Sequence, residues 1–146
     1  MMIKRWTLLC LALCLTLTGC GGDGGHTYDT QAPRAMTVSP TQNSVVNGAT
    51  SVITVTFDEP LDATTIDLAS ISLEDGDGIT LAGTVSYDVS TYSVTFTPTT
   101  VLQSLTTYTV VVAAGIADDA GNVRDDDMVW SFSTSDFSPP APPATE

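Results

Sequence analysis

Apolar and polar residues alternate with a period of two through most of the chain after residue 50, and the polar positions are mostly threonine and serine. This period is that of a β-strand with one buried face, because successive side chains point to opposite sides of a strand. The clearest segments are 52–57, 92–97, 107–112 and 128–133, and weaker ones are 36–39, 70–74 and 83–87. The pattern therefore predicts seven strands.

Turn-forming sequences separate these strands, and no segment shows the 3.6-residue period of an amphipathic helix. Residues 62–66 predict a single helical turn, with Asp62 as its N-cap. Seven short strands in about 100 residues predict an all-β fold, an immunoglobulin-like β-sandwich of antiparallel strands. We expect it to form a single domain over residues 34–135. The turn signals are Asp75-Gly76-Asp77-Gly78, Asp88 to Thr91 and Asp119-Ala120-Gly121-Asn122.

Residues 1–19 have the pattern of a secretory signal peptide. Lys4 and Arg5 precede an apolar stretch that ends at Leu17 and is too short to span a bilayer as a permanent helix. Its end, Leu17-Thr18-Gly19-Cys20, resembles the lipobox of bacterial lipoproteins, which implies that Cys20 is lipidated and becomes the first mature residue. The alternative is an ordinary signal peptide cleaved near Gly19, which would leave an unpaired thiol on a secreted protein.

Cleavage would change the charge of the chain. The whole sequence has 4 basic and 17 acidic residues and a formal charge of −13. Loss of Lys4 and Arg5 leaves two basic residues, Arg34 and Arg124, and a formal charge of −15. Because an acidic chain repels phosphate, we expect no nucleic-acid partner, whereas a divalent cation or a basic protein surface would suit it.

The segments on either side of the predicted domain differ from it in composition. Residues 20–33 consist of Cys20 and a Gly-rich stretch with nothing apolar enough to pack, which predicts a flexible tether. Such a tether reaches roughly 20 Å on average. Residues 136–146 are Pro-rich and predict a disordered tail, with a linker, a spacer or a ligand for a proline-binding groove as the alternatives.

Several segments resemble the motifs of one known protein family and follow the same order along the chain. They are Ile53-Thr54-Val55-Thr56-Phe57-Asp58-Glu59-Pro60-Leu61-Asp62, Val94-Thr95-Phe96-Thr97-Pro98, Thr106-Thr107-Tyr108-Thr109-Val110, Asp119-Ala120-Gly121-Asn122 and Trp130-Ser131-Phe132-Ser133-Thr134. From about Ala32 to Thr134 the chain resembles the bacterial SbsA-type Ig-like domain. The resemblance implies a binding or spacing role outside the cytoplasm, as in surface-layer proteins, adhesins and envelope lipoproteins, and no common enzymatic activity.

Some of these residues have a structural explanation. Leu102 and Tyr108 have the spacing of a tyrosine corner, in which the phenol hydrogen-bonds to nearby backbone. We expect Trp130 and Phe132 to lie in the core between the two sheets, because a buried large side chain contributes about 1.5–3 kcal/mol.

The residue inventory argues against an enzyme. The mature chain has no lysine, its one histidine is His26 in the tether, and its one cysteine is Cys20. Neither a Ser-His pair nor a thiolate nucleophile can therefore be assembled on a rigid frame. A carboxylate pair could act as acid and base, but a small sandwich offers no deep cleft for it.

Acidic residues are the one feature of the domain that could form a site. If the loops follow immunoglobulin order, nine carboxylates share one pole of the sandwich, including three at 125–127. Calcium takes six to eight oxygen ligands at such flexible sites, so the cluster is a candidate calcium site, with a solvated face and a basic protein partner as the alternatives. The candidate metal ligands are Asp58, Glu59, Asp62, Asp88, Asp118 and Asp119.

The sequence thus predicts a non-enzymatic, lipid-anchored binding or spacer module of the bacterial cell envelope. It would need no cofactor, and its partners would be the membrane, through the N-terminal lipid, and an unidentified protein or envelope component. Gly21 follows the predicted lipid site, where an aspartate would resemble an inner-membrane retention signal, so the outer membrane is favoured. The alternative function is a calcium-stabilised structural or adhesive module that uses the acidic loops.

Overall fold

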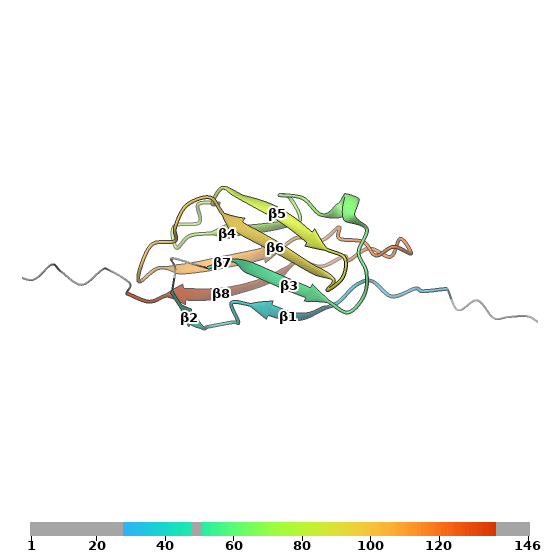
Figure 1. The fold of residues 1–146 in the computed structure, drawn as a ribbon, viewed down its shortest axis with the longest axis horizontal. Helices are drawn as coiled ribbons and strands as arrows, with labels where there is room; N and C mark the ends of the chain where they lie inside the picture. The colour runs from blue at the N-terminus through green and yellow to red at the C-terminus, as the bar shows by residue number, and fades with distance from the viewer. Residues whose placement is uncertain (1–27, 48–50, 137–146) are drawn as a thin grey trace, which may run out of the picture.

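The structure is a computed structural model that describes residues 28–47 and 51–136, and in it eight strands form two four-stranded sheets (Figure 1). One sheet has the order β1 (Ala35–Ser39), β3 (Ile53–Phe57), β6 (Ser93–Pro98), β5 (Gly83–Asp88). The other has the order β2 (Val45–Val46), β8 (Met128–Thr134), β7 (Thr107–Val112), β4 (Ile71–Glu74). The predicted all-β sandwich is confirmed. The predicted signal peptide, Cys20 and all but one residue of the predicted tail lie outside the described residues.

The strand that the pattern missed is β2. It is two residues long and pairs in parallel with β8, with Val45 opposite Ser133 and Val46 opposite Thr134, so the sandwich is not antiparallel throughout. Two residues are too few to show a period, which is why the sequence predicted seven strands and the structure has eight. Between β1 and β2 the chain crosses from one sheet to the other, and the indole Nε1 of Trp130 donates to the Pro40 carbonyl at 2.8 Å there.

A short helix lies where it was predicted. A 3₁₀ turn, η2 (Ala63–Thr65), follows Asp62, whose carboxylate accepts from the Thr64 backbone N–H. In the described part of the chain, no helix is long and apolar enough to cross a membrane.

The inward positions of the alternating segments form one continuous core. Along β3, Ile53, Val55 and Phe57 are buried while Thr54 and Thr56 between them are only half-buried. The predicted positions of Trp130 and Phe132 between the sheets are confirmed, since both are buried and belong to this core. The other buried apolar residues in it are Leu61, Ile71, Leu73, Val94, Phe96, Leu102, Tyr108, Val110, Val112 and Ile116.

The tyrosine corner is also confirmed. The phenol oxygen of Tyr108 accepts from the Gln103 backbone N–H at 2.8 Å, which ties the entry of β7 to the segment before it. The same ring stacks on Phe132, with 5.8 Å between ring centroids and 26° between ring planes. Tyr108 therefore joins two strands of one sheet and one loop.

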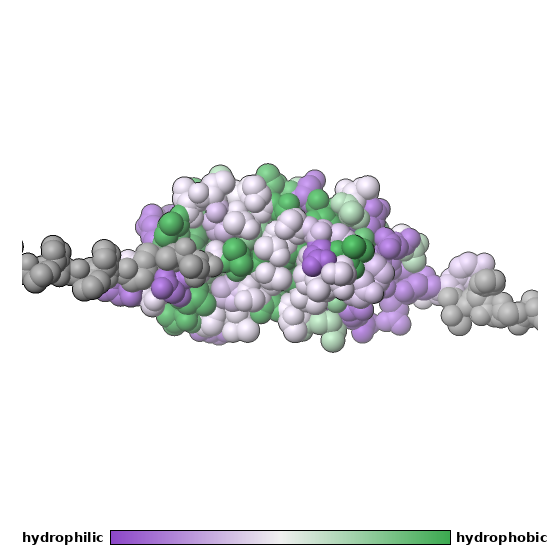
Figure 2. Space-filling view, viewed as in Figure 1, coloured by the Kyte–Doolittle hydropathy of each residue, from purple (hydrophilic) through white to green (hydrophobic). Residues whose placement is uncertain are grey.

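Hydroxyl groups cover the outer faces of both sheets. Threonine and serine side chains face each other across paired strands and hydrogen-bond, as Thr56 and Ser93 do at 2.9 Å. The middle of the face visible in Figure 2 is accordingly of intermediate hydropathy. Such cross-strand pairs stabilise a sheet by a few tenths of a kcal/mol each. The other pairs are Thr54–Thr95, Thr107–Ser133 and Thr109–Ser131.

A glycine in β5 is required by the core. A Cβ at Gly83 would lie 2.3 and 2.6 Å from two ring atoms of Phe96 and 2.8 Å from the Thr97 carbonyl oxygen. Phe96 is buried, so its ring has little room to retreat.

We therefore expect Gly83→Ala to destabilise the domain by about 1–3 kcal/mol, the usual cost of overpacking a core. The melting temperature, Tm, should fall by several degrees in a thermal melt followed by circular dichroism. Gly76→Ala is the matched control, because its Cβ would meet only the Thr107 carbonyl oxygen, at 3.6 Å. Equal Tm values for the two variants would contradict this expectation and show that the Phe96 ring can move away from a Cβ at position 83 without cost to stability.

Candidate functional site

The strand order brings the acidic loops together at one pole of the sandwich, as the sequence predicted. The ends of β3, β5 and β7 and the starts of β1, β6 and β8 all lie there (right in Figure 1). Hydrophilic side chains gather at this end of the molecule in Figure 2. We call this end the acidic pole, and its carboxylates are Asp29, Asp58, Glu59, Asp62, Asp88, Asp118, Asp119, Asp125, Asp126 and Asp127.

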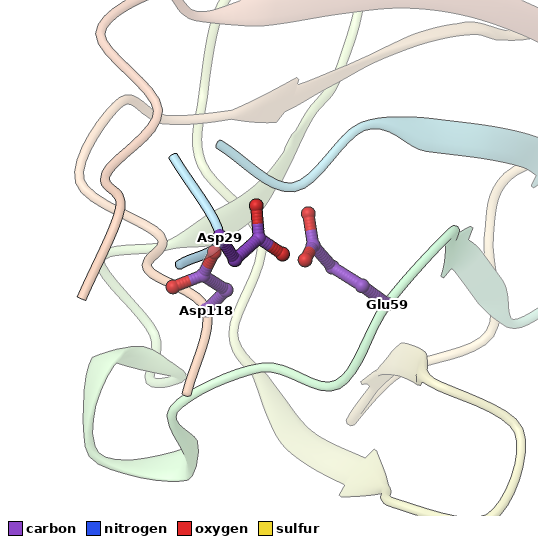
Figure 3. Close-up of side chains that lie close together, drawn as sticks. All are labelled: Asp29, Glu59 and Asp118. Carbon is purple, nitrogen blue, oxygen red and sulfur yellow. The ribbon is translucent and has the colours of Figure 1, made fainter. Parts of the chain in front are cut away.

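Three of these carboxylates lie close together and form what we call the acidic trio: Asp29, Glu59 and Asp118. One oxygen from each lies within 4.8 Å of the others. They come from three separate segments, the chain before β1, the chain after β3 and the loop between β7 and β8. Asp29 and Glu59 point toward each other, with Asp118 beside Asp29 (Figure 3). Such a group is a set of oxygen ligands that could hold a hard cation.

Asp118 is the fixed member of the trio. It is only 3% exposed, and its two oxygens accept from the backbone N–H and the side-chain amide of Asn122 at 2.8 and 2.7 Å. Burial raises the pKa of Asp118, but these bonds and the N–H groups of Ala120 and Gly121 outweigh it and lower the pKa below its usual value. The turn therefore opens at Asp118, one residue before the predicted turn Asp119-Ala120-Gly121-Asn122.

Glu59 is the member whose protonation changes near neutral pH. Partial burial, a hydrogen bond with Asp29 and the nearby negative charges of Asp29, Asp118 and Asp58 together raise the pKa of Glu59 to about 7. Two carboxyl groups can hydrogen-bond to each other only if one of them carries a proton. At acidic pH Glu59 is therefore protonated and can hydrogen-bond to Asp29. At alkaline pH both carboxylates are charged and repel each other.

The other predicted metal ligands have local roles. Asp58 accepts from the Arg34 backbone N–H at 2.8 Å. Asp62 accepts from the side chain and backbone of Thr64, and these bonds lower its pKa. Asp88 accepts in the same way from Ser90, which lowers the pKa of Asp88. Asp119 is exposed.

The structure thus brings together two of the six predicted ligands, Glu59 and Asp118, and adds Asp29. Sequence reasoning missed Asp29 because it lies within the segment predicted to be a flexible tether. That segment carries no periodicity that could have placed it against the domain.

Arg124 holds the chain before β1 in place. Its guanidinium donates to the carbonyl oxygens of Pro33 at 3.1 Å and Asp126 at 3.3 Å, both of them backbone groups rather than carboxylates. Its buried Nε has no hydrogen-bond partner. The guanidinium borders a cavity of about 370 Å³ between residues 30–34 and residues 124–126. The only two basic residues of the predicted mature chain, Arg34 and Arg124, therefore both lie at the acidic pole.

The sequence profile of the bacterial Ig-like domain family matches residues 29–134. The chain belongs to this family. The match begins at Asp29, so the first member of the acidic trio is also the first residue of the Ig-like domain as the family defines it. A comparison with curated proteins finds no match.

Solved structures with the same fold include part of a surface-layer protein. The Ig-like domain superimposes on the S-layer protein rSbsC(31-844) with a TM-score of 0.54 and 25% identity, over 72% of this chain and 14% of that one. Two other solved structures match in fold at lower identity. They are PcoC, a methionine-rich copper resistance protein from Escherichia coli (TM-score 0.59, 17% identity, 72% of this chain and 100% of that one), and CopC from Methylosinus trichosporium OB3b (0.55, 11%, 73% and 97%).

The protonation of Glu59 predicts a pH dependence of stability for the Ig-like domain. The folded chain holds the Glu59 proton with a pKa of about 7, whereas in the unfolded chain Glu59 has its ordinary pKa of 4.5. Since the folded state binds more protons in this interval, the free energy of unfolding should fall as the pH rises from about 4.5 to about 7. Urea denaturation at a series of pH values measures this free energy. Glu59→Gln keeps a hydrogen-bond donor toward Asp29 and should make the free energy of unfolding nearly independent of pH in this interval.

The matched control is Glu74→Gln, the same change at the opposite pole of the sandwich. Between these pH values, Glu74→Gln should leave the dependence of the free energy of unfolding on pH the same as in the original chain. The lowered pKa values of Asp62, Asp88 and Asp118 affect stability at lower pH, where those carboxylates become protonated. A slope that survives Glu59→Gln would assign the pH dependence to another group.

Proposed function

We propose that this protein is a non-enzymatic, lipid-anchored binding or spacer module of the bacterial cell envelope. The membership of residues 29–134 in the bacterial Ig-like domain family is the observation that carries the proposal. The likeness to part of an S-layer protein supports a place at the cell surface or envelope. The lipobox-like Leu17-Thr18-Gly19-Cys20 supplies the anchor, with a diacylglyceryl group on the Cys20 thiol. Since Gly21 follows that cysteine, the outer membrane is the membrane we propose.

The role that follows is presentation of the domain to an envelope component or another protein. Several acyl chains on one cysteine hold a protein firmly, whereas a single chain binds only marginally. Residues 21–28, rich in glycine, separate the anchor from the start of the family match. Asp29, near the start of the described chain, lies at the acidic pole.

Two observations support a role without catalysis. Residues 28–136 contain no histidine, cysteine or lysine, so the described part of the chain has none of these nucleophiles or bases. Of the trio carboxylates, Asp118 is buried and already accepts on both oxygens. It is therefore poorly placed to exchange a proton with a substrate.

The anchor is tested by Cys20→Ala. The original protein should partition with the membranes, and the variant should move to the soluble fraction, because the lipid has lost its attachment site. Detergent partition of cell extracts with an immunoblot measures it. Cys14→Ala, within the predicted signal peptide, is the control and should stay with the membranes. A Cys20→Ala protein that remains membrane-bound would contradict the lipid anchor.

A second candidate function is a calcium-stabilised module, and the acidic trio is the observation that favours it. Three carboxylates within 4.8 Å of one another repel unless a proton or a cation lies between them. Calcium would take at least one oxygen from each of the three carboxylates and complete its shell with water. Binding would displace the Glu59 proton, so calcium affinity should rise with pH.

For this candidate we expect calcium to raise the Tm of the Cys20→Ala chain. An affinity of about 10⁻⁴ M, typical of extracellular modules, gives about 2.7 kcal/mol at 10 mM calcium and a rise of about 10 °C or more. The rise should be larger at pH 8 than at pH 5, and Asp29→Asn should abolish it. Asp77→Asn, at the opposite pole, is the control. An unchanged melt at pH 8 would leave the acidic pole as a solvated face.

A further inference from the structure

The two sheets end in four edge strands, β1, β5, β2 and β4, and three of these edges are protected against pairing with another strand. The register of β1 with β3 shifts between Ala35 and Thr37, and β2 is only two residues long. The edge of β4 is covered by the chain that follows it, because the Leu81 N–H donates to the Leu73 carbonyl at 2.8 Å. Irregular register, short strands and covering segments all keep sheet edges from associating.

The edge strand without such protection is β5. It runs over Gly83–Asp88 in unbroken register with β6, and among the described residues it pairs with β6 alone. It contains no proline, and Asp88 at its end is its only charged residue. A long, regular edge with few charges is a template on which another strand can pair.

The backbone of β5 presents hydrogen-bonding groups to this open edge. The Ala82 carbonyl accepts from the Thr99 N–H at 2.9 Å, so residue 82 faces β6. The alternation along a strand then turns the backbone groups of residues 84, 86 and 88 toward β6 and those of residues 83, 85 and 87 toward the open edge. On the outer face, the side chains of Thr84 and Ser86 are exposed. An incoming strand would therefore meet backbone donors and acceptors beside a row of hydroxyl groups.

From this geometry we propose that β5 is a self-association surface, on which β5 of a second copy of the chain pairs antiparallel, with Val85 opposite Val85 of the second copy. The sheets that contain β5 in the two copies would then form one continuous sheet. Pairing at β5 goes beyond the proposed envelope role and needs only the folded domain, so it does not depend on a lipid anchor.

The side chains of β5 are complementary to those of a second copy. A two-fold axis through Val85 places Thr84 opposite Ser86 of the second copy, and Ser86 opposite its Thr84. The sheets already contain hydroxyl pairs of this kind, such as Thr56 with Ser93 at 2.9 Å. The outer hydroxyl face would thus continue across the contact between the two copies.

The antiparallel direction also suits the charge of the chain, which is −13 for the whole sequence. Because β5 ends at the acidic pole, a second copy that runs the opposite way has its acidic pole at the other end of the pair (Figure 1). Asp88 would lie opposite Ala82 of the second copy rather than opposite a carboxylate. A parallel pairing would bring the two acidic poles together, which repulsion between like charges opposes.

A groove beside β5 supplies apolar surface to the contact. It has a volume of about 500 Å³, and Leu68 in its wall is 58% exposed. Val85 lines the same groove and lies on the proposed two-fold axis, so the groove would meet its equivalent on the second copy. Burial of this surface would favour association. The other residues that line the groove are Asp67, Ala69, Gly83 and Thr84.

Cysteine cross-linking tests the pairing in cells that make the full chain. Opposite residues of a non-hydrogen-bonded antiparallel pair, such as Thr84 and Ser86 of the second copy, have Cα atoms about 4.5 Å apart, which a disulfide can span. The double variant Thr84→Cys, Ser86→Cys should give disulfide-linked dimers on a non-reducing gel after mild oxidation. The matched control is Thr37→Cys with Ser39→Cys, two exposed residues with the same spacing on β1, which should give several-fold less dimer.

The original chain, which carries Cys10, Cys14 and Cys20, measures the background of the cross-linking. Equal yields of linked dimer from the two double variants would overturn the proposal. A product in which β5 is linked to a protein of another mass would also overturn it, because that protein would then be the occupant of the edge.

Charge exchange across the pair is the second test, and it separates pairing from folding. Thr84→Asp with Ser86→Asp puts like charges opposite each other, and so does Thr84→Lys with Ser86→Lys. From detergent extracts of whole cells, two tagged forms of either double variant should co-purify about tenfold less than two tagged forms of the original chain, because opposed like charges destabilise strand pairs. The acidic variant mixed with the basic variant should recover co-purification, since each carboxylate then faces an ammonium group.

Recovery on mixing would also show that both variants fold. Failure to recover, self-association of either variant at the level of the original chain, or no co-purification of the original chain with itself would each overturn the proposal. The extracts contain the protein whether or not it is anchored. A Cys20→Ala protein that stays with the membranes would therefore overturn only the anchor.

Discussion

The two sheets are held face to face by the apolar layer between them, and the other features of the domain depend on this contact. Residues 28–136 contain no cysteine, so no disulfide joins the sheets of the described domain. Each large side chain buried there contributes about 1.5–3 kcal/mol. The alternation of apolar and hydroxyl residues places these side chains inward and leaves threonine and serine to pair on the outer faces. Phe96 shows how tightly the layer is filled, since its ring occupies the space that a side chain at position 83 would need.

The same core allows an unfavourable arrangement of charge at one end. The acidic trio brings three carboxylates within 4.8 Å, and the cost appears as a Glu59 pKa raised to about 7. Asp118 is held there by the turn it closes with Asn122, so it has little freedom to move away. Because the three carboxylates lie so close, Glu59 keeps its proton up to about neutral pH.

The acidic pole and the pairing of β2 with β8 are different parts of the fold. The acidic pole collects the loops and the chain before β1, and it is the surface that a partner or a cation would meet. The parallel pairing of β2 with β8 lies toward the opposite pole and links the two sides of the chain.

Residue type and local spacing were enough to predict the fold class, the seven longer strands, the Asp62 cap, the tyrosine corner and the inward positions of Trp130 and Phe132. A period of two or a short motif records each of these. Residue type and spacing were not enough to predict that Asp29 lies against Glu59 and Asp118, that Asp118 rather than Asp119 opens its turn, or that Val45 and Val46 form a parallel strand. These features depend on contacts between segments far apart in the chain, and neither a two-residue strand nor a carboxylate in a polar segment carries a periodic signal that would reveal them.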